Sequence, residues 1–184
     1  MKKIILITIA LIVTMCLISC EKDYPEEVTY SAKNTHGFKL NDEKWVTFIT
    51  GFNHIGIDYD TLNSQLQFHL ISKQEKVDRY PNGNLYIQLI IDDENFDSET
   101  KFPFAEFDDK IWDTNNLDSS LAYCEFNINN EQTDNSTYSK VISGELHILR
   151  FDTIVAGTFE ARLSNGKDTI TLTDGKFDYK LTTF

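Results

Sequence analysis

The chain has 184 residues, with 29 acidic side chains against 17 basic ones and a formal net charge of −12. Such a surface repels nucleic-acid phosphates and anionic lipid head groups, so nucleic acid is not expected as a partner. Behind the N-terminal segment the chain has the length of one domain, with a core large enough to fold without disulfides.

The first residues form an apolar segment with a positive start. Lys2 and Lys3 precede an uncharged run from Ile4 to Ile18, whose fifteen residues fall short of the ~20 that a membrane-spanning helix needs. A positive start, a short apolar run and a small residue at its end are typical of a signal peptide.

Leu17, Ile18, Ser19 and Cys20 close this run and resemble the lipobox of bacterial lipoprotein signal peptides. The resemblance implies that residues 1–19 are removed, that diacylglycerol is attached to the Cys20 sulfur, and that palmitate-like chains acylate the new amino terminus. Several acyl chains on one residue anchor a protein stably, whereas one chain binds only reversibly. An ordinary secretory peptide with an incidental cysteine is the alternative.

A charged segment, residues 20–33, follows and is expected to be an acidic, flexible tether. Glu21, Asp23, Glu26 and Glu27 look like the export signal that sends lipoproteins of some Gram-negative bacteria to the outer face of the outer membrane. A solvated linker without export information is the alternative. Because both basic residues of the signal are lost, the mature chain would carry 15 basic and 29 acidic residues, a net charge of −14.

Residues 34–184 read as one domain built from short strands. Apolar and polar residues alternate in several runs, and this period of two places one set inward and the other in water. Trp45 takes a core position on one such run. The clearest inward sets are Leu66, Phe68 and Leu70; Leu85, Ile87, Leu89 and Ile91; Phe159, Ala161 and Leu163; and Phe177, Tyr179 and Leu181.

Turn signals separate these runs at Asn41-Asp42, 81–84, Asn165-Gly166 and Asp174-Gly175. Asn-Gly and Asp-Gly mark tight hairpins, because both central residues of the favoured turn need positive φ. We expect longer loops at 51–61, 92–120 and 129–138. The sequence predicts an all-β fold of about eight to ten strands, either a single antiparallel β-sandwich or a flattened up-and-down barrel, and does not choose between them.

The opening of this domain at residues 34–46 and its close from Ser143 to Leu181 resemble a family of short bacterial envelope lipoproteins of unknown function. The opening NTHGFKLNDEKWV, residues 34–46, matches the family's first hairpin, although Asp42 stands where the family prefers Gly. The close, SGELHI, AGTFEARL and TDGKFDYKL, matches its last strands and a terminal hairpin. The resemblance implies an all-β, secreted lipoprotein domain and carries no catalytic residues.

No pattern for catalysis or metal binding stands out in the sequence. Cys124 lies in the apolar run LAYCEF and is expected to be a buried small hydrophobe. None of the four histidines, His36, His54, His69 and His147, is spaced as a metal ligand. A nucleophile elbow and a phosphate-binding glycine loop are also missing from the sequence. The sequence therefore predicts neither a metal nor a cofactor.

In one segment, residues 94–112, aromatic and acidic residues are interspersed. Its rings are Phe96, Phe102, Phe104, Phe107 and Trp112. Exposed rings in acidic loops suit sugar stacking or a partner surface, so this segment is the candidate ligand or partner patch. Rings that plug one end of the fold are the alternative. An irregular calcium site among the loop acids is also open.

Together these features favour a lipid-anchored envelope lipoprotein on the outer membrane, facing the cell surface and acting as a non-enzymatic binding or structural module. Its partners would be the membrane, through the lipid on Cys20, and a glycan or an envelope protein. A lipocalin-like carrier with an apolar cavity is the alternative. An envelope glycosidase, which needs two carboxylates facing each other in a cleft, is a third reading.

Overall fold

The structure is a computed structural model that describes residues 34–47, 56–75, 81–91, 96–98, 100–106, 117–129 and 135–183. These residues form eleven strands and no helix, so the predicted all-β fold is confirmed. The strands are β1 Thr35–Leu40, β2 Glu43–Thr47, β3 Gly56–Asp60, β4 Gln65–Gln74, β5 Asn82–Ile90, β6 Lys101–Glu106, β7 Ala122–Asn129, β8 Ser136–Tyr138, β9 Lys140–Phe151, β10 Ile154–Ser164 and β11 Thr169–Thr183.

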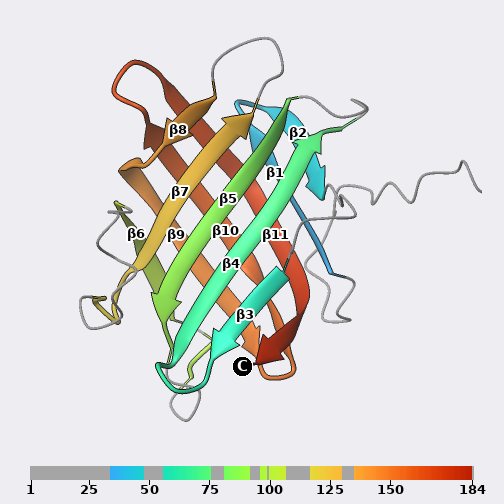
Figure 1. Cartoon of the computed structure of the whole chain (residues 1–184), viewed down its shortest axis with the longest axis vertical. Coiled ribbons are helices and arrows are strands. Elements are labelled where there is room, and N and C mark those ends of the chain that lie inside the picture. Colours follow the sequence, from blue (N-terminus) through green and yellow to red (C-terminus); the bar gives the residue numbers. More distant parts are fainter. Residues whose placement is uncertain are drawn as a thin grey trace, which may run out of the picture.

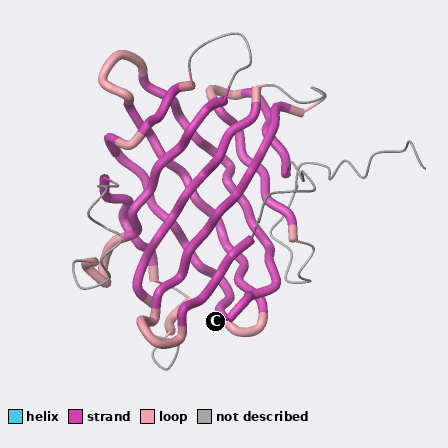
Figure 2. Tube along the Cα trace, in the orientation of Figure 1, coloured by secondary structure: helices cyan, strands magenta, loops and turns pink. Residues whose placement is uncertain are grey.

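The strands close on themselves into a flattened barrel. Hydrogen-bonded pairing runs β1-β2-β4-β5-β7-β6-β9-β10-β11 and returns from β11 to β1. Figure 1 shows β4, β5 and β7 crossing the front and β9, β10 and β11 running along the other diagonal behind them. The trace in Figure 2 shows the same two walls as nearly continuous strand. Closure matters physically, because it removes the free edges on which open sheets pair with other chains.

Two of the expected turns form as hairpins. Asn41 and Asp42 have φ of 48° and 72° and join β1 to β2, whose residues pair in register. Gly166, with φ of 85°, lies in the loop between β10 and β11, where the Asn165 side chain accepts hydrogen bonds from the backbone N–H groups of Lys167 and Asp168. Residues that tolerate positive φ therefore stand where the chain reverses.

At Asp174-Gly175 the expected hairpin is wrong, because β11 continues through both residues. Asp174 adopts a left-handed φ of 52°, and the register against β10 shifts between Phe159 and Ala161. The dipeptide thus makes a β-bulge, which needs the same backbone conformation as a tight turn. The Lys39 ammonium pairs with the Asp174 carboxylate at 2.5 Å across the neighbouring strand.

Three strands lie within segments that were expected to be loops. β3 lies in 51–61, β6 in 92–120 and β8 in 129–138. β3 pairs with β4 and, in parallel, with the end of β11. β6 connects the walls, because it pairs in parallel with β7 and antiparallel with β9. The sheet is therefore mixed rather than purely antiparallel.

Aromatic rings from both walls fill the interior. Phe68 of β4 meets Phe177 of β11 edge to face, with ring centroids 5.1 Å apart. Phe38 of β1 packs between Trp45 at 6.1 Å and Phe126 of β7 at 5.7 Å. These residues belong to one continuous buried cluster. Each fully buried large apolar side chain contributes roughly 1.5–3 kcal/mol, so this cluster is the main source of stability.

Candidate functional site

The lipobox residues Leu17, Ile18, Ser19 and Cys20 lie outside the described residues, as does the tether at 20–33. Lipidation at Cys20 therefore stays a prediction from the sequence. The first described strand, β1, begins at Thr35 and pairs directly with β2 and β11. An anchor at Cys20 would thus be separated from the barrel by the length of the tether.

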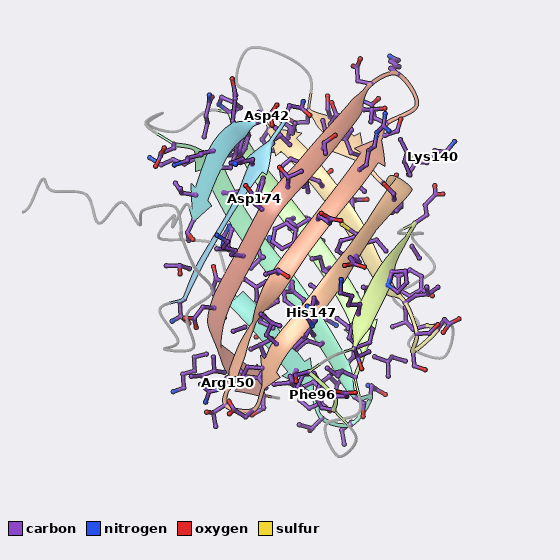
Figure 3. All side chains as sticks on the ribbon, turned by 180° about the vertical axis from the view of Figure 1, so that it is seen from behind. Asp42, Phe96, Lys140, His147, Arg150 and Asp174 are labelled. Atoms are coloured by element: carbon purple, nitrogen blue, oxygen red, sulfur yellow. The ribbon has the colours of Figure 1, made fainter. Side chains whose placement is uncertain are left out.

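The structure describes three of the five rings of the candidate aromatic patch. Phe102 and Phe104, both on β6, are buried members of the core, with 6% and 8% of their surface exposed. Phe96 is half-buried and packs on that core, with its ring 5.7 Å from the ring of Phe151. Figure 3 labels Phe96 near one end of the barrel. Phe107 and Trp112 lie outside the described residues. The described rings of this patch therefore contribute to packing.

A small group of polar side chains lies inside the barrel among the rings. The His36 ring nitrogen Nδ1 is 2.7 Å from the Tyr179 hydroxyl. Thr47 accepts the backbone N–H of His36 at 2.7 Å and donates its hydroxyl to the His36 carbonyl at 2.9 Å. Burial raises the pKa of Tyr179 above its usual range. These bonds tie β1, β2 and β11 together, a structural role.

Cys124 is buried on β7, as expected from the sequence. Burial, with a smaller effect from the Glu125 charge, raises the pKa of the Cys124 thiol. A reactive cysteine needs the opposite, an accessible thiol whose pKa is lowered by positive charge. Cys124 is therefore a core residue and lacks the surroundings of a reactive cysteine.

A hollow of about 310 Å³ opens on the wall formed by β9, β10 and β11, the wall that faces the viewer in Figure 3. It lies beside the bulges that β9 and β11 form against β10, and Gly144 of β9 adopts φ of 143° there. Charged side chains at its rim are Glu145, Glu160 and Arg162, and hydroxyl groups of Ser143, Thr171 and Thr173 also line it.

The two carboxylates of the hollow do not form a catalytic pair. Glu145 and Glu160 are direct cross-strand neighbours, but Glu160 is exposed and Glu145 is half-buried and paired with the Lys101 ammonium. A glycosidase needs one carboxyl that is desolvated enough to stay protonated as the general acid. Among the described residues only one carboxylate, Asp178, is buried. The described residues thus lack the pair of buried carboxylates that the glycosidase reading requires.

Two of the described loop carboxylates accept hydrogen bonds from neighbouring residues in their own turns. The Asp118 carboxylate accepts hydrogen bonds from the backbone and side chain of Ser120, and these bonds lower the pKa of Asp118. Asp152 is held in the same way by Arg150 and the backbone of Ile154, which lower its pKa. Within the described ranges, no three His, Cys, Asp or Glu side chains gather as a metal site.

Comparison with models of protein families, with curated proteins and with solved structures found no match. The described part of the chain holds no helix with the length and apolar character for a membrane crossing. The motif at Cys20 and the geometry of the β domain are therefore the observations on which a function can be proposed.

Proposed function

We propose that the protein is a bacterial envelope lipoprotein, held to the outer membrane by lipid on Cys20, whose β domain is a non-enzymatic binding or structural module. The observation that carries this proposal is the lipobox-like Leu17-Ile18-Ser19-Cys20 at the end of an apolar run too short to span a bilayer. An acyl-anchored protein needs a soluble body, and a closed barrel with a filled core is such a body.

The filled interior favours this module over the carrier. A lipocalin-like carrier keeps an apolar cavity inside the barrel, whereas here rings from opposite walls meet at the centre, as Phe68 and Phe177 do at 5.1 Å. The proposal therefore assigns binding to the outer surface of the barrel. The acidic tether at 20–33 supports export to the outer face, where that surface would meet the surroundings of the cell.

Metabolic labelling with an alkyne analogue of palmitate tests the anchor. The wild-type protein should incorporate the label, sediment with outer membranes, and give no peptides from residues 2–19 in mass spectrometry. Cys20→Ser should lose the label, because no thiol is left at the acceptor position. Cys124→Ser is the matched control and should keep it, since Cys124 is buried in the core.

Label on Cys20→Ser, or a wild-type protein that retains residues 2–19, would contradict the lipoprotein assignment. Surface exposure is read separately, by adding a protease to intact cells. Degradation of the wild-type protein without loss of a periplasmic marker is expected, and full protection would place the domain on the inner face.

A further inference from the structure

The hollow on the wall of β9, β10 and β11 lies between two bulges. The register of β9 against β10 shifts between Arg162 and Leu163, and that of β11 against β10 shifts between Phe159 and Ala161. A bulge bends its strand and increases the local twist, so bulges on both sides of β10 account for a depression in this wall. Its volume of about 310 Å³ lies at the lower end of the range for small-ligand sites. This wall faces the viewer in Figure 3.

Arg162 lies between two hydroxyl residues in this hollow. The strand register places it directly opposite Ser143 of β9 on one side and Thr171 of β11 on the other, and all three residues line the hollow. Directly paired residues of neighbouring antiparallel strands share a face, with Cβ atoms about 4.5–5.5 Å apart. Guanidinium and hydroxyl groups all donate hydrogen bonds, so this row brings donors from three strands together.

Arg162 and its two neighbours do not use these donors within the part of the chain that the structure describes. Arg162 is exposed, and its guanidinium makes no hydrogen bond or ion pair with any described residue. The side-chain hydroxyls of Ser143 and Thr171 make none with the described residues either. Donors from three neighbouring strands are therefore available to a ligand in one hollow.

The strands around the hollow are not acidic, unlike the chain as a whole. β9, β10 and β11 carry five basic and four acidic residues, a net charge of +1, against −12 for the chain. Of the two carboxylates in the hollow, that of Glu145 is paired with the Lys101 ammonium. The other, Glu160, lies two residues from Arg162 on the same face of β10. One available guanidinium near one carboxylate favours a ligand with a single negative charge over a dianion.

The remaining lining of the hollow is polar at its surface. Its larger apolar side chains, Ala161 and Leu172, belong to the barrel core, and Thr173 adds a third hydroxyl. Peptide partners usually place side chains in apolar pockets, and neutral sugars pack their C–H face on an aromatic ring. The described lining offers neither feature, so charge and hydrogen bonds have to select the ligand.

We propose that the hollow binds a carboxylated sugar, a uronic acid unit of an acidic glycan, with the sugar carboxylate on Arg162. The guanidinium fork matches a planar carboxylate through two parallel hydrogen bonds, and this geometry fixes the orientation of the ligand. The hydroxyls of Ser143, Thr171 and Thr173 both donate and accept, as the hydroxyls of a sugar ring require. The inference rests on the proposed function as a binding module and names its partner class.

Isothermal titration calorimetry of the full-length protein in a nonionic detergent tests the proposal. The probes are oligosaccharides of galacturonate, hyaluronan and alginate, each compared with its carboxyl-reduced form, which keeps the sugar rings and loses the charge. At least one acidic probe should bind, and its reduced form should bind at least about tenfold more weakly. Equal binding of the reduced form, a preference for glucose 6-phosphate over all acidic probes, or no binding at all would overturn the proposal. Lipid labelling at Cys20 is measured independently, so this result and the anchoring result remain distinguishable.

Four variants locate the binding site. Arg162→Gln should weaken binding about tenfold to a hundredfold, because the charged hydrogen bonds are lost, and Arg162→Lys, which keeps the charge without the fork, should weaken it less. Thr171→Val keeps the branched shape, loses one hydroxyl, and should weaken binding about threefold to tenfold. Lys180→Gln removes a charge from an exposed position at the other end of the β10–β11 pairing; it is the control and should bind as the wild type does. Unchanged affinity of Arg162→Gln, with its urea midpoint preserved, would remove the hollow as the site.

Discussion

At the residue scale, the packing of Gly83 shows how closely the core is filled. A methyl group built on Gly83 would lie 2.3 Å from Cζ of Phe126 and 3.1 Å from Cζ3 of Trp45. Both rings are almost fully buried and contact each other at 6.1 Å between centroids. Neither ring can move without displacing a neighbour, because protein interiors are packed as densely as crystals.

We therefore expect Gly83→Ala to lower the free energy of unfolding by about 1–3 kcal/mol, the usual cost of overpacking. Urea denaturation followed by Trp fluorescence measures it. Asn84→Ala, next to it on β5 but on the outer face, is the control and should change stability by less than about 0.5 kcal/mol.

Repeating the substitution in a Phe126→Leu chain shows whether the clash with the ring causes the loss of stability. Gly83→Ala should cost less in a Phe126→Leu chain, where the smaller side chain leaves room for the methyl group. The same cost in both backgrounds would mean that the clash with Phe126 is not the reason.

Which residues face inward was largely predictable from the alternation alone. Phe68, Leu85, Phe159 and Phe177 are all buried as expected, and so are Trp45 and Cys124. The period of two suffices because one face of each strand lies in the core, although β4, β5 and β7 also bury some residues of the other face, such as Gln88. Which rings meet was not predictable, since contacts such as that of Gly83 with Phe126 join residues far apart in the chain. That the rings of His69 and Tyr86 stack on each other was also not predictable, because their contact depends on the register of β4 and β5.

At the element scale, the bulge in β11 depends on the backbone of Asp174. Its φ of 52° is left-handed, a conformation that costs most L-residues about 1–2 kcal/mol and that Asn and Asp tolerate best. The neighbouring Lys39 ammonium donates to the Asp174 carboxylate and lowers its pKa, chiefly through this hydrogen bond. Both partners are substantially exposed, so the ion pair contributes little compared with the conformation.

Two substitutions of Asp174 separate these effects. Asp174→Val should lower the free energy of unfolding by about 1–2 kcal/mol, because a β-branched residue resists positive φ. Asp174→Asn keeps the conformation and should lose only the small ion-pair contribution. That contribution belongs to the ionised carboxylate, whose pKa is depressed in the fold, so it is present above about pH 4 and lost as pH falls below it.

Urea titrations at pH 7 and pH 3 measure both. A difference between the wild type and Asp174→Asn that grows at pH 3 would contradict the sign expected for this pair. If Asp174→Val were no less stable than Asp174→Asn, the bulge would not depend on left-handed backbone.

The sequence predicted only some of the strand boundaries, because the same turn dipeptide can form either a hairpin or a bulge. Asn41-Asp42 and Asp174-Gly175 both signal positive φ, but positive φ serves a hairpin in one case and a bulge in the other. Only the pairing of β11 with β1 and β10 decides between them. β8, with three residues, is too short for alternation to be recognised. Pro103 inside β6, and Gly56 with two aspartates in β3, are residues that strands disfavour, so these two segments read as loops.

At the scale of the whole molecule, one strand closes the barrel. β11 pairs with β10, with β1 and with β3, so the last strand in sequence joins the first ones. The all-β class followed from the sequence, but closure did not, because it depends on these long-range pairings. Side chains of β11 that lie in the core are Ile170, Leu172, Phe177 and Tyr179.

We expect a chain that ends at residue 168 not to fold. The truncation removes β11 and with it four buried side chains, each worth roughly 1.5–3 kcal/mol. Their summed contribution is comparable with the whole free energy of unfolding of a domain, about 5–15 kcal/mol. It also leaves β1, β3 and β10 with open edges, which favour aggregation. Near-UV circular dichroism and amide chemical-shift dispersion should show no fixed tertiary structure. A chain that starts at residue 34 keeps every described strand and should unfold cooperatively, as the matched control. Cooperative unfolding of the truncated chain would mean that the barrel is stable open and that its closure by β11 adds little.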